Sequence, residues 1–115
     1  MTFEVVSAHF TGAANTIITA AERATEATAQ QALQDCNYYC KQDTSALINS
    51  SLLWSETSRG LLRWVTPYAE HQYDYPGTRR VKNPNATPQW CKTAQDMHLT
   101  EWNGVFENAI RRFST

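Results

Sequence analysis

A stripe of small side chains between residues 13 and 41 constrains this chain more than any other feature. Seven residues recur at steps of three or four: Ile17, Ala21, Ala24, Thr28, Ala32, Cys36 and Tyr39. This spacing places them on one face of an α-helix, and the surrounding Ala, Gln and Glu favour helix formation. We therefore predict a long helix from about Ala13 to Lys41, packed closely against a neighbour because most of the stripe is small.

The middle of the chain predicts a β-hairpin. Two segments, 52–57 and 61–66, are short and rich in large apolar residues, and Ser58-Arg59-Gly60 separates them as a tight turn in which glycine allows a positive φ. In this arrangement Trp54 and Trp64 would be cross-strand or diagonal neighbours. Residues 3–10 contain many β-formers and fit either a first strand or an extended arm.

A second long helix is expected from Pro88 to Phe113, with Thr87 as its N-cap. Its apolar face would consist of Trp90, Ala94, Met97, Trp102, Val105, Phe106, Ala109 and Phe113. Trp64 and Trp90 are expected in the core. The predicted fold class is α+β, in one domain spanning residues 1–115: a long N-terminal helix, a central antiparallel β-hairpin or small sheet, and a C-terminal helix.

Charge is unevenly distributed along a chain whose net charge is only −1. Residues 1–56 contain two basic and six acidic side chains (−4), whereas residues 57–115 contain eight basic and five acidic ones (+3). Four of the basic residues, Arg79, Arg80, Lys82 and Lys92, lie in a stretch that has no acid between Asp74 and Asp96. Opposite charge at the two ends favours head-to-tail packing of identical copies.

The sequence contains no recognisable catalytic constellation, and we expect no enzyme activity. His9, His71 and His98 are isolated, and no phosphate-binding or nucleophile motif is present. Three cysteines, an odd number, are expected to be reduced and buried rather than to form disulfides or bind metal. We therefore expect no catalytic, metal or cofactor site.

The first residues lack a basic region followed by an apolar run, so we expect no signal peptide. No segment is long and apolar enough to suggest a membrane span. These features predict synthesis in the cytosol and no membrane association.

Four segments resemble the pattern of a tailed-phage minor capsid protein family. They are residues 43–47 (D-T-S-A-L), 64–69 (W-V-T-P-Y-A), 72–73 (Q-Y) and 83–86 (N-P-N-A), the last followed by Trp90 and Ala94. Ser45 stands where the family usually has glycine. The likeness extends from about Asp43 to Trp102 and depends on the order and spacing of the segments, because none is specific alone.

This family is similar to neck, or head-tail connector and tail-completion, proteins of long-tailed phages. The resemblance implies a virion structural subunit that forms a homo-oligomeric ring, a hexamer or dodecamer, at the head-tail interface. Its partners would be the portal-adaptor or head-completion proteins and the tail terminator or tail tube protein. The resemblance leaves open whether the lumen of the ring lies close to DNA without specific contacts. The alternative is a small soluble phage-encoded binding or regulatory protein that is absent from the virion.

Five residues are expected at subunit or partner contacts in this assembly. They lie in and beside the long loop that runs from Tyr75 to Thr87, a length typical of functional loops in small domains. The residues are Tyr73, Tyr75, Arg79, Arg80 and Lys82.

Overall fold

The computed structural model describes residues 1–5, 15–41, 46–75 and 83–113. In chain order its elements are β1 (Thr2–Glu4), α1 (Asn15–Tyr38), α2 (Ala46–Trp54), the 3-10 helix η1 (Thr57–Arg59), β2 (Leu61–Arg63), α3 (Ala69–Asp74) and α4 (Trp90–Phe113). Two long helices and a two-stranded antiparallel sheet confirm the predicted α+β class. In these ranges no helix is long and apolar enough to cross a membrane.

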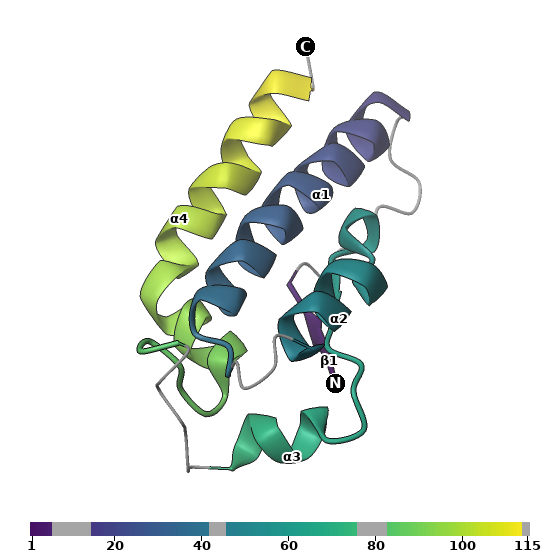
Figure 1. The fold of residues 1–115 in the computed structure, drawn as a ribbon. Helices are drawn as coiled ribbons and strands as arrows, with labels where there is room; N and C mark the ends of the chain where they lie inside the picture. The colour runs from purple at the N-terminus through teal and green to yellow at the C-terminus, as the bar shows by residue number, and fades with distance from the viewer. Residues whose placement is uncertain (6–14, 42–45, 76–82, 114–115) are drawn as a thin grey trace.

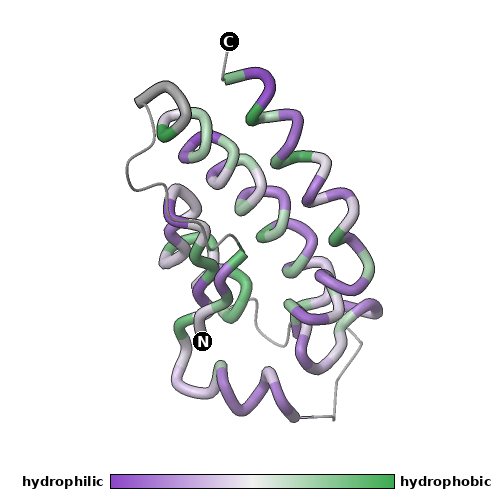
Figure 2. The backbone as a smooth tube through the Cα atoms, turned by 180° about the vertical axis from the view of Figure 1, so that it is seen from behind, coloured by the Kyte–Doolittle hydropathy of each residue, from purple (hydrophilic) through white to green (hydrophobic). Residues whose placement is uncertain are grey.

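Helices α1 and α4 lie side by side and run in opposite directions, forming the longest layer of the molecule (Figure 1). The predicted stripe on α1 is buried at Ala21, Ala24, Thr28, Ala32 and Cys36, and Tyr39 is half-buried. Ile17 lies outside the residues whose side chains are described. The one polar member, Thr28, donates from Oγ1 to the Ala24 carbonyl at 2.7 Å, which satisfies its hydroxyl inside the packed face. Figure 2 shows hydrophilic and hydrophobic residues alternating along both long helices.

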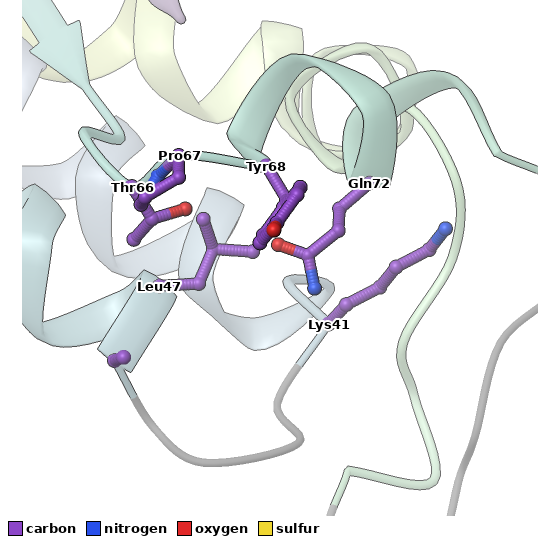
Figure 3. A pocket seen from close by; sticks show the side chains of 7 residues that line it. Lys41, Leu47, Thr66, Pro67, Tyr68 and Gln72 are labelled. Carbon is purple, nitrogen blue, oxygen red and sulfur yellow. The ribbon is translucent and has the colours of Figure 1, made fainter.

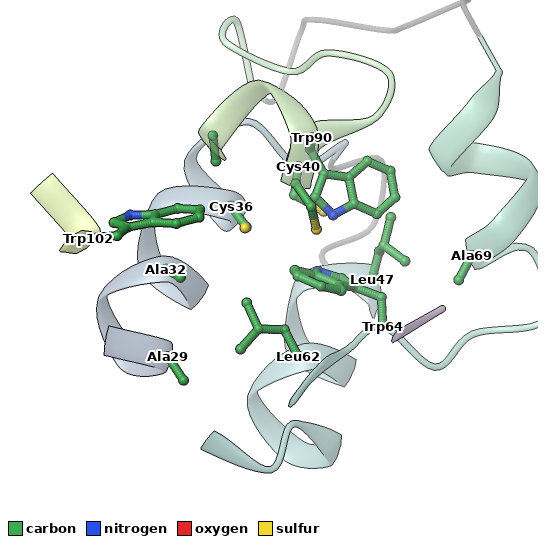
Figure 4. Close-up of a cluster of buried hydrophobic side chains, with 12 residues drawn as sticks. Ala29, Ala32, Cys36, Cys40, Leu47, Leu62, Trp64, Ala69, Trp90 and Trp102 are labelled. Carbon is green, nitrogen blue, oxygen red and sulfur yellow. The ribbon is translucent and has the colours of Figure 1, made fainter. Parts of the chain in front are cut away.

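Trp64 and Trp90 are fully buried, as predicted, and lie edge to face with ring centroids 6.0 Å apart. Cys36, Cys40 and Leu62 pack in the same cluster (Figure 4). The indole nitrogen of Trp64 donates to Asn37 Oδ1 at 3.0 Å. The core therefore joins the end of α1, strand β2 and the beginning of α4.

Strand β2 pairs with β1, so the predicted hairpin between segments 52–57 and 61–66 is wrong. The antiparallel register places Phe3 opposite Leu62, and the backbone of Met1 exchanges two hydrogen bonds with that of Trp64. Only an isolated bridge between Glu56 and Leu61 remains of the expected pairing. The predicted turn is present, because Gly60 has a φ of 72° and closes η1.

Residues 52–54 belong to helix α2, and Trp54 and Trp64 are therefore not strand neighbours. The helix buries Leu47, Ser50 and Ser51, which are spaced at three and four residues and so share one helical face.

The N-P-N-A segment closes the end of α1. Asn83 is buried, and its Nδ2 donates to the carbonyls of Tyr38 and Cys40 at 3.1 and 2.7 Å. The Thr87 amide donates to the carbonyl of Tyr39 at 3.0 Å. Three successive carbonyls that the helix itself cannot satisfy thus receive donors from one segment more than forty residues later.

Helix α4 begins at Trp90 rather than at Pro88, and Thr87 is not its N-cap. Gln89 has a φ of 49°, a left-handed conformation that prevents the helix from extending backwards through Pro88. The Thr87 hydroxyl instead donates to Thr93 Oγ1 at 3.0 Å. The backbone amide of Gln89 donates to the Tyr73 carbonyl at 2.6 Å and ties this turn to α3.

The predicted apolar face of α4 is partly confirmed. Trp90, Ala94, Trp102 and Ala109 are buried, whereas Met97 is 66% exposed and does not belong to the core. Trp102 contacts α1, where its indole nitrogen donates to Asp35, whereas the ring of Trp90 packs against those of Trp64 and Tyr73.

Candidate assembly surface

Helix α2 presents three large apolar side chains to solvent. Leu52, Leu53 and Trp54 are 65%, 74% and 53% exposed; we call these three residues the α2 face. Scattered exposed leucines are common on protein surfaces, but a contiguous apolar group on one short helix is typical of an interaction site.

The buried side of α2 combines Leu47 with two small polar residues, Ser50 and Ser51, while larger apolar residues at the end of the helix are exposed. Ser50 Oγ donates to the Leu47 carbonyl at 2.7 Å and accepts from the Val65 amide at 2.9 Å. Ser51 Oγ donates to the Ile48 carbonyl at 2.7 Å and accepts from Asn37 Nδ2 at 2.9 Å. These bonds satisfy both hydroxyls and hold the helix in the orientation that exposes Leu52 and Leu53.

Exposed apolar side chains continue beyond α2. Val65 follows β2 and is half exposed, and Tyr68, just before α3, is 71% exposed. Tyr68 lines a shallow groove of about 320 Å³ together with Leu47, Pro67, Gln72 and Lys41 (Figure 3). Lys41 Nζ donates to the carbonyl of Tyr75, which directly follows α3. This bond links the wall of the groove formed by α3 to the segment that follows α1.

The predicted contact residues fall into three environments. Tyr75 is exposed, and its ring stacks on His71 with centroids 5.4 Å apart. Tyr73 is half-buried, with its ring edge to face against Trp90 at 4.8 Å. Arg79, Arg80 and Lys82 lie outside the described residues. The structure thus places one predicted contact at the surface and one against the core.

Sequence reasoning missed the α2 face because it assigned Leu52, Leu53 and Trp54 to a strand. A signal was available: Ser50 and Ser51 follow Leu47 at helical spacing, while the large apolar residues follow as a consecutive block. Periodicity alone does not distinguish a short helix from a strand in such a block.

The three cysteines are free thiols and fully buried, which confirms the prediction of burial. Burial is the main cause that raises the pKa of the Cys40 and Cys91 thiols far above the ordinary value. Both therefore stay protonated at neutral pH and pack as small apolar groups.

Ionisation of the Tyr73 hydroxyl should make the folded protein less stable in strong alkali. Burial raises the pKa of its hydroxyl to about 12, although the Lys92 amide, which donates to that oxygen at 3.3 Å, acts in the opposite direction. The unfolded chain releases this proton near pH 10. The buried, protonated hydroxyl therefore contributes fully to the free energy of unfolding below pH 10, and this contribution is lost as the pH rises to about 12. Urea titrations at pH 9, 10, 11 and 12 should show a smaller decline for Tyr73→Phe than for wild type; equal declines would contradict the expectation.

These features define a small α+β domain with a tightly packed aromatic core and an uncovered apolar surface, as is typical of a subunit that assembles with other proteins. The family model described as minor capsid protein matches residues 5–110, so the chain belongs to the minor capsid protein family. Neither the curated proteins nor the solved structures contain a match to the chain. The protein is accordingly a structural component of a phage virion.

Proposed function

We propose that this protein is a neck subunit that forms a ring between the portal-adaptor complex of the capsid and the tail. Family membership gives the virion structural role, and the exposed α2 face is the observation that supports assembly. The three large apolar side chains of the α2 face do not belong to the core cluster. They gain a role when a neighbouring subunit covers them.

Burial of the α2 face would contribute substantially to subunit association. Removing a leucine side chain from water stabilises a complex by roughly 1.5–3 kcal/mol, and most of Leu52 and Leu53 is available for this. A single heterologous contact repeated by rotation closes into a ring. The excess of acid in residues 1–56 and of base in residues 57–115 favours one relative orientation of adjacent copies.

We place the contacts to the connector and tail on and near the loop that leads to Asn83. Tyr75 supplies an exposed aromatic ring at its beginning, and Arg79, Arg80 and Lys82 supply positive charge. Tyr73, through its backbone carbonyl, anchors the turn where this segment enters α4. The partners in this proposal are the portal-adaptor or head-completion protein on one side and the tail terminator or tail tube protein on the other.

Leu53→Asp should prevent ring formation without unfolding the domain. A carboxylate at a position that is 74% exposed costs little in the free subunit but is unfavourable in an apolar interface. Mass photometry should show closed oligomers of six or twelve copies for wild type and mainly monomers for the variant, at unchanged melting temperature. Asn103→Asp is the matched control, because it adds the same charge at an exposed polar position of α4 and not on α2.

A cryo-EM map of the particle neck gives the decisive test of location. The expected result is density for this domain in a ring between portal and tail, with the α2 face covered. A protein that remains monomeric at high concentration, and that is missing from purified particles, would overturn the neck assignment in favour of a soluble regulatory role.

A further inference from the structure

One histidine and two carboxylates converge where α1 and α4 pack together. Asp35 lies on α1, and His98 and Glu101 lie one turn apart on α4. One potential ligand atom from each residue lies within 4.8 Å of the others, and His98 Nδ1 is 3.0 Å from Glu101 Oε2. More than sixty residues separate Asp35 from the other two, so this grouping exists only in the folded protein.

Two of the three side chains are already oriented by groups outside the cluster. Trp102 Nε1 donates to Asp35 Oδ2 at 2.7 Å, and Gln31 Nε2 lies 3.2 and 3.3 Å from the two oxygens of the same carboxylate. The His98 ring lies beside the ring of Tyr39, with centroids 6.2 Å apart, and its side chain is only 25% exposed. Hydrogen-bonded carboxylates of this kind are common around bound metal ions, where the outer donors fix the ligand.

The third side chain, Glu101, is 66% exposed and can rotate toward a bound ion. Among the residues that the structure describes, neither Asp35 nor Glu101 forms an ion pair with a lysine or arginine. Two adjacent carboxylates without a fixed cation produce a negative potential that a divalent ion would neutralise.

We propose that Asp35, His98 and Glu101 bind a zinc ion that links α1 to α4. One imidazole nitrogen and two carboxylate oxygens are ligands that zinc accepts, with water completing a tetrahedron. Ligands at roughly 2.0–2.2 Å from the metal lie about 3.3–3.6 Å apart, so contraction from the present spacing requires only rotation of Glu101 and small adjustments of the other two. Hard ions such as Mg²⁺ are disfavoured by the imidazole.

The experiment uses the untagged full-length protein after EDTA treatment and dialysis, titrated with ZnCl₂ by calorimetry. We expect saturable binding of one ion per chain and a rise in melting temperature on zinc addition. His98→Ala and Asp35→Asn should each weaken binding by about tenfold or more, in line with the effect of losing even an outer-shell partner. Asparagine retains an oxygen that accepts from Trp102, so Asp35→Asn keeps the packing of this region. His71→Ala, at an exposed histidine of α3, should bind zinc as wild type does.

Cobalt(II) substitution separates this site from the buried thiols. Cobalt bound by nitrogen and oxygen ligands should show visible d–d absorption without the near-ultraviolet charge-transfer band that a thiolate produces. Absence of saturable zinc binding, binding unaffected by His98→Ala, or a thiolate band would each overturn the proposal. Ring formation is measured separately by mass photometry, so a failed zinc site would leave the neck assignment intact, and the reverse also holds.

Discussion

Trp64→Ala is expected to lower the free energy of unfolding by about 3–5 kcal/mol, the range for removal of a large ring from a packed core. Trp64 is fully buried, contacts Trp90 edge to face and donates to Asn37. The substitution therefore leaves a large cavity and an unpaired Asn37 oxygen. A domain of this size has a total stability of about 5–15 kcal/mol, so much of the variant should be unfolded or aggregated at 37 °C.

Trp54→Ala is the matched control for this prediction, because the two tryptophans lie only ten positions apart. Trp54 is 53% exposed on α2, and its removal from the isolated subunit should change stability by about 0.5 kcal/mol or less. Urea denaturation followed by far-ultraviolet circular dichroism measures both variants. A Trp64→Ala midpoint close to wild type would show that this ring is not a core residue.

Asn83→Ala is expected to cost about 2–4 kcal/mol, because a buried carbonyl that loses its donor costs about 1–3 kcal/mol. The single Asn83 amide serves the carbonyls of both Tyr38 and Cys40, and its oxygen accepts from the Asn85 amide at 3.1 Å. The end of α1 would lose two of the three donors that close it. Hydrogen exchange should accelerate in residues 36–41 more than in the middle of α1.

Asn85→Ala provides the control within the same N-P-N-A segment. Asn85 is exposed, and only its backbone amide takes part in the turn. Its side chain can be removed with little change in melting temperature. Equal destabilisation by the two substitutions would mean that the segment acts through its turn conformation and not through the Asn83 amide.

The N-P-N-A segment also shows how a sequence pattern acquires a physical meaning in the structure. As a pattern it indicated a loop before the last helix and a family resemblance. The folded chain shows what asparagine does at residue 83: its amide nitrogen carries two donor hydrogens, and it donates to two carbonyls at once. The asparagine is therefore a helix cap supplied from a distant segment, which local sequence reasoning cannot identify.

The amino-acid sequence by itself determined the features that depend on neighbours three or four residues away. The small stripe from Ala21 to Cys36 required a closely packed helix, and Gly60 marked a turn with positive φ. The burial of Trp64 and Trp90 was predicted correctly, but the equally large Trp54 is 53% exposed, so residue size alone does not decide which tryptophan is buried. The helical stripe and the glycine turn, by contrast, are local constraints.

Tertiary structure alone decided which segments meet. Strand β2 pairs with residues 2–4 over its full length and keeps only an isolated bridge to Glu56. Leu52 to Trp54 instead form the end of a helix that buries Leu47, Ser50 and Ser51 and exposes these three large apolar side chains. The convergence of Asp35 with His98 and Glu101 likewise depends on the register between α1 and α4. Competition between distant segments is settled by the total free energy of packing, to which short-range periodicity contributes only one part.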